Sequence, residues 1–345
     1  MNSKHCHCCF IVPNYVLEAL VKSGHLKEAD THQQIIVDDF IRQNRNNVSN
    51  KLLNKGFMAV ATGKADRYVF NSKQTSSLNK NLVRKEAEAP VTDQDANDAY
   101  DNAGIVRAYY KTQLNRNSIN DHGLDLDLNV HYQKKLNNAF WDGNEMAFGD
   151  GDGKIFAHFA KGLDVIGHEL THGVVQYTAN FNQDEFPGTI NEHVADVFGT
   201  VIKQDFKKQN AQTADWLIGD EIVLPAFPGK ALRSMKAPGT AFQGDTQPDH
   251  MKNYQPWGGD PHLNNGIPNR AFYLVAAGDN TIAGIDTPDA GLLWYGALQT
   301  MKSTSNFNDL YTAVHEQAVK LSQAGKIPAN APQVVDFAFT TVGII

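Results

Sequence analysis

The sequence predicts an α+β fold in which a sheet-rich N-terminal lobe is followed by a helical C-terminal lobe. Stretches with strand-like composition or alternation concentrate before residue 162, and helical apolar spacing dominates from Gly162 onward. A chain of 345 residues is long enough for two such units and an extension. We therefore divide it into an N-terminal segment with a linker (1–50), a sheet-rich lobe (51–162) and a helical lobe (163–345).

The N-terminal segment is expected to contain short helices, because apolar residues lie near helical spacing from Phe10 to about Arg42. Residues 44–50 are almost wholly polar and rich in Asn, which is typical of an exposed linker that is open to cleavage. A simple interdomain loop has the same composition, so both interpretations stay open.

The sheet-rich lobe is expected to contain strands at 68–70, 124–132 and 145–148, where alternation or strand-like composition occurs. One helix is expected to interrupt these strands from Asp93 to Asn115. Polar residues at its start favour a capped beginning, and apolar residues further along form one stripe.

The motif that decides the chemistry is His168-Glu169-Leu170-Thr171-His172. Two imidazoles four residues apart on a helix project from one face and can bind one metal ion, with the Glu169 carboxylate beside them. Zinc held by three protein ligands lowers the pKa of water to about 7 and polarises a carbonyl, so Glu169 would act as the base in hydrolysis. The same five residues also occur on structural helices with a salt-bridged Glu, so a third ligand is needed.

Glu192 is the candidate third ligand, since it lies twenty positions after His172 and begins another helical apolar pattern. Asp196 follows Glu192 by one turn on the same face. A carboxylate there suits the orientation of a metal-bound imidazole, although a solvated helix charge would have the same position in sequence.

With these motifs in place, the chain resembles the thermolysin-like zinc metalloproteases from about Arg67 to Ile345. Segments of this sequence that match the family in the right order are 137–143, 146–153, 233–235, 248–250 and 262–267. Residues 9–13 are similar to the brief propeptide of the protealysin branch. The resemblance implies a zymogen of a neutral endopeptidase, with the zinc-binding helix at the cleft between the lobes and the propeptide as an intramolecular inhibitor.

The resemblance also implies roles for single residues. His168, His172 and Glu192 would hold one zinc ion, Glu169 would pass a proton from the attacking water to the leaving amine, and His262 would donate a hydrogen bond to the transition-state oxygen. Two departures from the family bear on this picture. The first is Gln183, which stands where the family carries a Tyr donor. The second is an altered segment at 257–261, which displaces the carboxylate that orients the catalytic His262. Asp260 is the candidate to replace that carboxylate.

Substrate contacts are implied in the same way. Asn138, Ala139 and Trp141 match the edge strand that pairs with an extended substrate backbone, and the planar fork of Arg233 would hold a substrate carbonyl. An apolar set matches the pocket for the residue after the scissile bond, although these residues also suit a plain core. Its members are Phe156, Phe159, Val165, Ile218, Ile222 and Leu232. A preference for large apolar residues is expected, in a pocket that the bulk of Phe159 makes shallower.

Calcium is expected to be absent or weakly bound, although the family commonly binds it through carboxylates. Asp164, Asp215 and Asp220 match three family ligands, but Lys203 and Leu217 stand at two others and cannot ligate calcium. The Lys203 ammonium is expected to replace the charge of the ion. At another family calcium site the oxygen ligands are replaced by Leu224 and Lys230. Zinc is thus the only metal cofactor expected.

Composition excludes several other roles. A net charge of −7 without clustered Lys and Arg disfavours nucleic-acid binding. No apolar run approaches the ~18–20 residues of a membrane span, and no Sec signal peptide is apparent. We expect a monomer that is cytoplasmic or exported by a route without a Sec signal peptide.

Cys6, Cys8 and Cys9 are the three cysteines of the chain, so the protease body contains no possible disulfide. A thiolate from this segment would occupy the open zinc position and keep the enzyme latent, or the thiols are simply buried or part of a disordered tip. The rival to a peptidase is a zinc-binding protein that has lost turnover, motivated by Gln183 and the altered segment before His262. Glu169 favours the enzyme, because zinc binding alone does not require a base.

Overall fold

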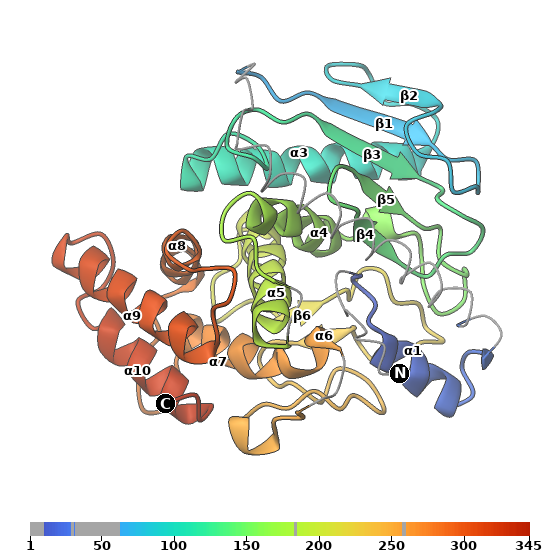
Figure 1. Ribbon diagram of the computed structural model, residues 1–345. Helices are drawn as coiled ribbons and strands as arrows, with labels where there is room; N and C mark the ends of the chain where they lie inside the picture. Colours follow the sequence, from blue (N-terminus) through green and yellow to red (C-terminus); the bar gives the residue numbers. More distant parts are fainter. Residues whose placement is uncertain (1–9, 29–30, 32–62, 183–184, 257–259) are drawn as a thin grey trace.

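The computed structural model describes residues 10–28, 31, 63–182, 185–256 and 260–345. A mixed sheet with helix α3 lies on one side of the molecule and a group of helices on the other, with α4 and α5 between them (Figure 1). The α+β fold with a sheet-rich first lobe and a helical second lobe is therefore confirmed. The linker at 44–50, the three cysteines and Gln183 lie outside the described residues.

The sheet has five strands in the order β2-β1-β3-β5-β4. Strand β3 is parallel to both of its neighbours, whereas β2 and β4 pair antiparallel to β1 and β5. The strands are β1 (Arg67–Asn71), β2 (Leu82–Lys85), β3 (Leu126–Val130), β4 (Ala139–Trp141) and β5 (Met146–Phe148). The three expected strands correspond to β1, β3 and β5. Strand β4 is at one edge, so its outer side is available for another extended segment.

Helix α3 (Gln94–Leu114) confirms the helix expected between Asp93 and Asn115. The Asp93 side chain accepts a hydrogen bond from the backbone of Ala96 at the first turn, and Asn115 ends the helix in a left-handed conformation. Both are favoured terminators, because Asp satisfies an orphan N–H and Asn tolerates positive φ at low cost.

The second lobe is built from helices around a buried apolar core. Its elements are α5 (Glu185–Lys207), the short strands β6 (Leu217–Ile218) and β7 (Arg233–Ser234), the 3-10 turn η2 (Met251–Asn253), and helices α6 (Pro261–Asn264), α7 (Gly266–Ala277), α8 (Thr287–Leu298), α9 (Phe307–Gln323) and α10 (Ala331–Thr341). Helix α9 begins with a capping box, in which Asn306 and Asp309 satisfy each other's backbone N–H groups.

Helix α4 (Leu163–Gln176) follows the short turn η1 (Phe159–Lys161) and is buried along its whole length. It packs against α5 through two glycines. A Cβ atom at Gly167 would lie 3.0 Å from the Cα atom of Gly199, and one at Gly199 would lie 2.7 Å from the Asp164 carbonyl oxygen. Larger residues at these positions would separate the helices, so the glycines set how closely side chains from α4 and α5 approach one another.

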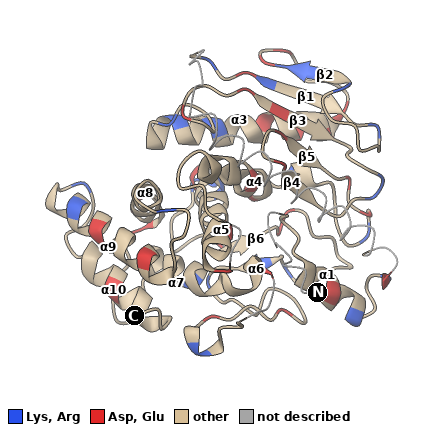
Figure 2. Ribbon diagram, viewed as in Figure 1, with Lys and Arg blue, Asp and Glu red and all other residues tan. Residues whose placement is uncertain are grey.

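The N-terminal segment packs against this body through helix α1 (Asn14–Lys22), whose residues Val16, Leu17 and Leu20 are buried. Figure 1 shows this segment below the β4 edge of the sheet. Positions of Lys and Arg alternate with positions of Asp and Glu along the ribbon of both lobes (Figure 2). Among the described helices, none is long and apolar enough to cross a membrane.

Candidate active site

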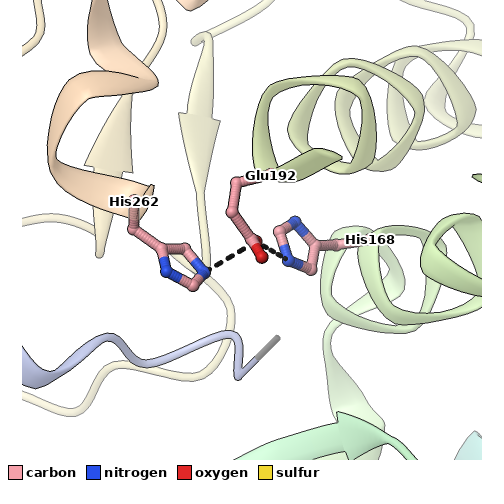
Figure 3. Close-up of side chains that lie close together, drawn as sticks. All are labelled: His168, Glu192 and His262. Atoms are coloured by element: carbon pink, nitrogen blue, oxygen red, sulfur yellow. Dashed lines mark ion pairs between the residues drawn. The ribbon is translucent and has the colours of Figure 1, made fainter. Parts of the chain in front are cut away.

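Helices α4 and α5 bring His168, His172 and Glu192 together in the core between the lobes. The Nε2 atoms of the two histidines are 3.0 Å apart, and Oε2 of Glu192 lies 3.3 Å from the first and 3.4 Å from the second. All three side chains are fully buried. Figure 3 shows the Glu192 carboxylate between the imidazoles of His168 and His262.

These three side chains fit a zinc ion. Bonds of about 2.0–2.2 Å from zinc to nitrogen and oxygen place the ligand atoms of a tetrahedral site about 3.4 Å apart, close to the separations observed here. A different trio, which replaces His172 by His262, also has its ligand atoms within 4.8 Å of one another. We favour His172, because the 2.8 Å between His262 Nε2 and Glu192 Oε2 is a hydrogen-bond distance and is shorter than a tetrahedral edge.

The other ring nitrogens of the two ligand histidines face acceptors. Nδ1 of His168 lies 2.8 Å from Oδ1 of Asp196, and Nδ1 of His172 lies 3.1 Å from Oδ1 of Asn191. The proton on each ring is therefore assigned to Nδ1, so that Nε2 presents its lone pair on the Glu192 side.

Asp196 is the centre of a buried polar network. Arg233 donates to both of its oxygens, at 2.8 and 2.9 Å, and the amides of Asn265 and Asn269 donate to Oδ2 at 2.8 and 2.9 Å. Burial by itself raises the pKa of Asp196, but Arg233 and His168 outweigh it and hold that pKa well below its ordinary value. Asp196 is therefore an ionised, fixed acceptor for His168.

Sequence reasoning missed a chain of hydrogen bonds that ends at Asp196 and is formed by His193, Asn269 and Trp294. The Trp294 indole donates to Nε2 of His193 across 2.6 Å, and Nδ1 of His193 lies 2.7 Å from the Asn269 carbonyl oxygen. Burial lowers the pKa of His193 to about 4, so the ring is neutral and donates to Asn269. Asn269 in turn orients its amide toward Asp196. Asn265 lies in the segment 262–267, which resembles the family. No local sequence pattern, however, indicates that the amides of Asn265 and Asn269 bind Asp196.

Glu169 lies on α4 beside the two histidines and is fully buried. The backbone N–H of Trp141 on β4 donates to its Oε2 atom across 3.0 Å. The indole of Trp141 donates to Gln176 on α4, which fixes the strand against the helix. The Trp141 backbone, expected to pair with substrate, is thus engaged with Glu169 through its N–H.

His262 lies in the first turn of α6, opposite Glu192. Asp260 caps this helix by accepting from the His262 backbone, and the same carboxylate oxygen lies 3.0 Å from Nδ1 of the ring. Burial lowers the pKa of His262, but the carboxylates of Glu192 and Asp260 raise it above its ordinary value. The altered segment before His262 therefore still supplies a carboxylate to this ring.

The N-terminal segment runs along the edge strand. The Ile11 N–H points at the Ala139 carbonyl oxygen across 3.4 Å, and the Asn138 side chain both accepts from the Val12 N–H and donates to its carbonyl, at 3.0 and 3.1 Å. Arg233 donates to the carbonyl oxygen of Ile11 across 2.9 Å. Three residues expected to bind a substrate backbone therefore bind the backbone of this segment.

The expected pocket residues Phe159, Val165 and Leu232 are fully buried. They belong to the same apolar cluster as Ile11 and Val12 of the N-terminal segment. The structure therefore places these side chains in one continuous core with that segment.

The carboxylates at the expected calcium position surround a lysine. Nζ of Lys203 donates to Asp164 across 3.0 Å, to Asp220, and to the Leu217 carbonyl oxygen across 3.2 Å. Asp215 instead accepts a hydrogen bond from the backbone of Leu217. Burial lowers the pKa of Lys203, but the carboxylates raise it above its ordinary value. The Lys203 ammonium therefore contacts two of the three expected carboxylates.

Comparison with known proteins places this site in a family. Residues 30–176 match the thermolysin metallopeptidase catalytic domain, and residues 179–344 match the thermolysin metallopeptidase alpha-helical domain. An extracellular metalloprotease of Pectobacterium carotovorum subsp. carotovorum is 34% identical over 97% of this chain and 96% of its own length. The chain belongs to the thermolysin metallopeptidase family. The resemblance seen in the sequence is thus confirmed, and the protein is a metalloprotease of a zinc-dependent family.

Other members of the thermolysin family give the same result. A thermolysin of Bacillus caldolyticus is 39% identical over 73% of this chain and 46% of its own length. Among solved structures, the precursor of protealysin, a metalloproteinase from Serratia proteamaculans, superposes with a TM-score of 0.80 at 33% identity, covering 97% of this chain and 99% of that one. The similarity to a precursor includes the N-terminal segment, so the comparison supports a propeptide-bearing form.

Proposed function

We propose that this thermolysin-family chain is a zinc-dependent neutral endopeptidase made as a zymogen. The observation that carries the proposal is the convergence of His168, His172 and Glu192 to separations of 3.0–3.4 Å beside Glu169. Bound zinc supplies Lewis-acid polarisation of the scissile carbonyl and acidifies water. Two imidazoles and one carboxylate are the donor set of such hydrolytic zinc sites.

Glu169 is proposed as the general base. Its carboxylate is oriented by the Trp141 N–H and lies one residue from a zinc ligand, where it takes a proton from the attacking water and returns it to the leaving amine. His262 is proposed to donate a hydrogen bond from Nε2 to the oxygen that becomes negative, with Asp260 positioning the ring through Nδ1. Asp196 is proposed to keep His168 in the tautomer that binds metal.

Substrate is proposed to bind as an extended segment on the outer side of β4. Asn138, Ala139 and Arg233 supply the polar groups that bind the main chain of Ile11 and Val12 in the zymogen. Because these bonds are made to backbone atoms, they suit many sequences. Specificity then comes from the apolar residues Phe159, Val165 and Leu232, which favour a large apolar side chain after the scissile bond.

The N-terminal segment is proposed as the inhibitor of the zymogen. It already occupies the hydrogen-bonding groups that a substrate backbone would need, so substrate and propeptide compete for one surface. Its attachment is strengthened by helix α1, whose buried residues Val16, Leu17 and Leu20 remove apolar area from water. Removal of this segment is therefore required for access to the site.

Cleavage of an unfolded protein tests the proposal. The wild type, after removal of the N-terminal segment, is expected to cleave it and to stop when a zinc chelator is added. Glu169→Ala is expected to lose activity by at least ~100-fold while retaining zinc, because loss of general base catalysis costs about 10²–10⁴-fold. The matched control is Glu316→Ala, which changes an exposed glutamate and leaves the rate unchanged. Full-rate cleavage by Glu169→Ala contradicts the mechanism, and no cleavage by the wild type favours a binding protein.

A further inference from the structure

A second group of histidines and carboxylates lies outside the candidate active site, in the sheet-rich lobe. It comprises Asp93, Asp95, Asp98, His131, Asp150 and His158, which we call the His131 cluster. Its members come from the start of α3, the residue after β3, the loop after β5 and the residue before η1. Four segments far apart in the sequence therefore meet there, and the proposed peptidase mechanism uses none of them.

The ligand atoms of His131, Asp95 and Asp150 converge on one point. Nδ1 of His131 lies 2.7 Å from Oδ1 of Asp150 and 3.7 Å from Oδ2 of Asp95, and the three ligand atoms all lie within 4.8 Å of one another. The 2.7 Å separation is a hydrogen-bond distance and is shorter than the edge of about 3.4 Å expected between neighbouring ligands of a tetrahedral ion, so an ion at this point requires Nδ1 of His131 and Oδ1 of Asp150 to move apart. The side chains are only partly exposed, so an ion has access from solvent.

The far side of the His131 ring is fixed by another carboxylate. Nε2 of His131 lies 3.0 Å from Oδ2 of Asp93. The other oxygen of Asp93 accepts a hydrogen bond from the Ala96 N–H at the start of helix α3, and this bond fixes the carboxylate. The Asn71 amide also donates to Oδ2. A carboxylate on one ring nitrogen fixes the tautomer so that the opposite nitrogen carries the lone pair. Nδ1 of His131 faces the carboxylates of Asp150 and Asp95, so either a proton on Nδ1 or a metal ion lies between the ring and these carboxylates.

The charges of the cluster point the same way. The cluster contains four aspartates and two imidazoles. The second imidazole, His158, lies 3.3 Å from Asp95 and 3.5 Å from Asp98. Within the described parts of the chain, none of these four carboxylates has a Lys or Arg within 4.0 Å. The amide of Gln74 donates to Asp150 across 3.1 Å, but it carries no charge. Even with both imidazoles protonated, the cluster keeps an excess of negative charge.

We propose that the His131 cluster is a second metal site, which binds a borderline divalent ion such as zinc through Nδ1 of His131 and the carboxylates of Asp95 and Asp150. Mixed imidazole and carboxylate donors suit zinc, manganese or cobalt, whereas calcium takes oxygen ligands. Asp93 positions the imidazole. The ion joins the start of α3 to the end of β3 and the loop after β5, so its role is to stabilise the sheet-rich lobe.

Metal stoichiometry tests the site in the full chain. After equilibrium dialysis at micromolar free zinc, the wild type is expected to hold two zinc ions, and His131→Gln and Asp95→Asn one each. His172→Ala removes a ligand of the catalytic site and is also expected to leave one. His122→Gln is the matched control, because His122 is an exposed histidine of the same lobe outside the cluster, and it should leave two ions.

A thermal measurement gives a second readout. Once the catalytic site is filled, a further rise in free zinc should raise the Tm of the wild type and of His122→Gln but not of His131→Gln. A single zinc in the wild type, lost in His172→Ala and kept in His131→Gln, overturns the proposal and makes the cluster an ion-pair network held by protons. Because the two sites lose their ions to different substitutions, failure of this proposal is distinguishable from failure of the peptidase proposal.

Discussion

Nη1 of Arg233 lies 2.9 Å from the carbonyl oxygen of Ile11, while the Nε and Nη2 atoms of the same guanidinium bind Asp196. One buried side chain therefore links the N-terminal segment to the carboxylate that holds His168. The planar fork of arginine makes this possible, because it directs donors to a carboxylate and to a third acceptor at once. Loss of the propeptide exposes a donor that is already oriented by Asp196.

Arg233→Lys should weaken the binding of substrate while the chain still folds. A single ammonium cannot reach both oxygens of Asp196 and a backbone carbonyl together, so one hydrogen bond from a charged donor is lost, worth about 1.5–3 kcal/mol. The KM of the mature enzyme for peptides should rise by roughly tenfold or more. Steady-state kinetics measure this, with Arg270→Lys as the control for an arginine that pairs with Asp249 outside the site. An unchanged KM would show that Arg233 does not bind substrate.

Maturation should remove roughly the first fifty residues, because the polar stretch at 44–50 has the composition of a cleavable linker. Mass spectrometry of purified wild type should show the shortened chain. Glu169→Ala should stay at full length if the enzyme processes itself. An active wild-type enzyme that keeps residues 1–50 covalently attached would count against a propeptide.

Lys203→Ala should destabilise the protein strongly. Removing one partner of a buried ion pair typically costs about 3–5 kcal/mol, and here Asp164 and Asp220 would face each other without the ammonium. Urea unfolding of the wild type and the variant measures the loss. Lys208→Ala, which removes an exposed lysine directly after helix α5, should change the free energy of unfolding little.

The dependence of the Tm on calcium is a second test of the charge cluster formed by Lys203, Asp164 and Asp220. Chelation of calcium at constant ionic strength should leave the Tm of the wild type almost unchanged, because the Lys203 ammonium already occupies the space between the carboxylates. Lys203→Glu restores an oxygen ligand and should make the Tm respond to calcium, although Leu217 still supplies only its backbone carbonyl. A large drop in wild-type Tm with zinc retained would refute the replacement of calcium by lysine.

Glu86 should contribute to stability in a pH-dependent way. Hydrogen bonds from Arg67, with support from Arg107, lower the pKa of Glu86 to about 2. A carboxyl whose pKa is lowered in the folded state stabilises the protein above its unfolded pKa of about 4.3, and this stability is lost as pH falls toward 2. Glu86→Gln should therefore lower the free energy of unfolding at neutral pH, and its difference from wild type should shrink on acidification. Glu88→Gln, which changes an exposed glutamate two residues away, is the control for loss of a carboxylate that does not bind Arg67.

Local patterns in the sequence were sufficient for several parts of this protein. The caps at Asp93 and Asn115 set the ends of α3, because hydrogen bonding at a helix terminus depends on neighbouring residues. The spacing of His168 and His172 placed both imidazoles on one helix face for the same reason. The order of motifs along the chain indicated the family, and with it the two lobes.

Contacts between distant segments were decided only by the tertiary structure. Glu192 reaches the two histidines because Gly167 and Gly199 let α4 and α5 approach closely, and no periodicity within either helix specifies that distance. In the Asp196 network Asn269 binds a residue 73 positions away, and in the His131 cluster His131 contacts Asp93, 38 positions away. Such pairings depend on how elements pack and which polar groups must be satisfied once buried, and these conditions exist only in the folded chain.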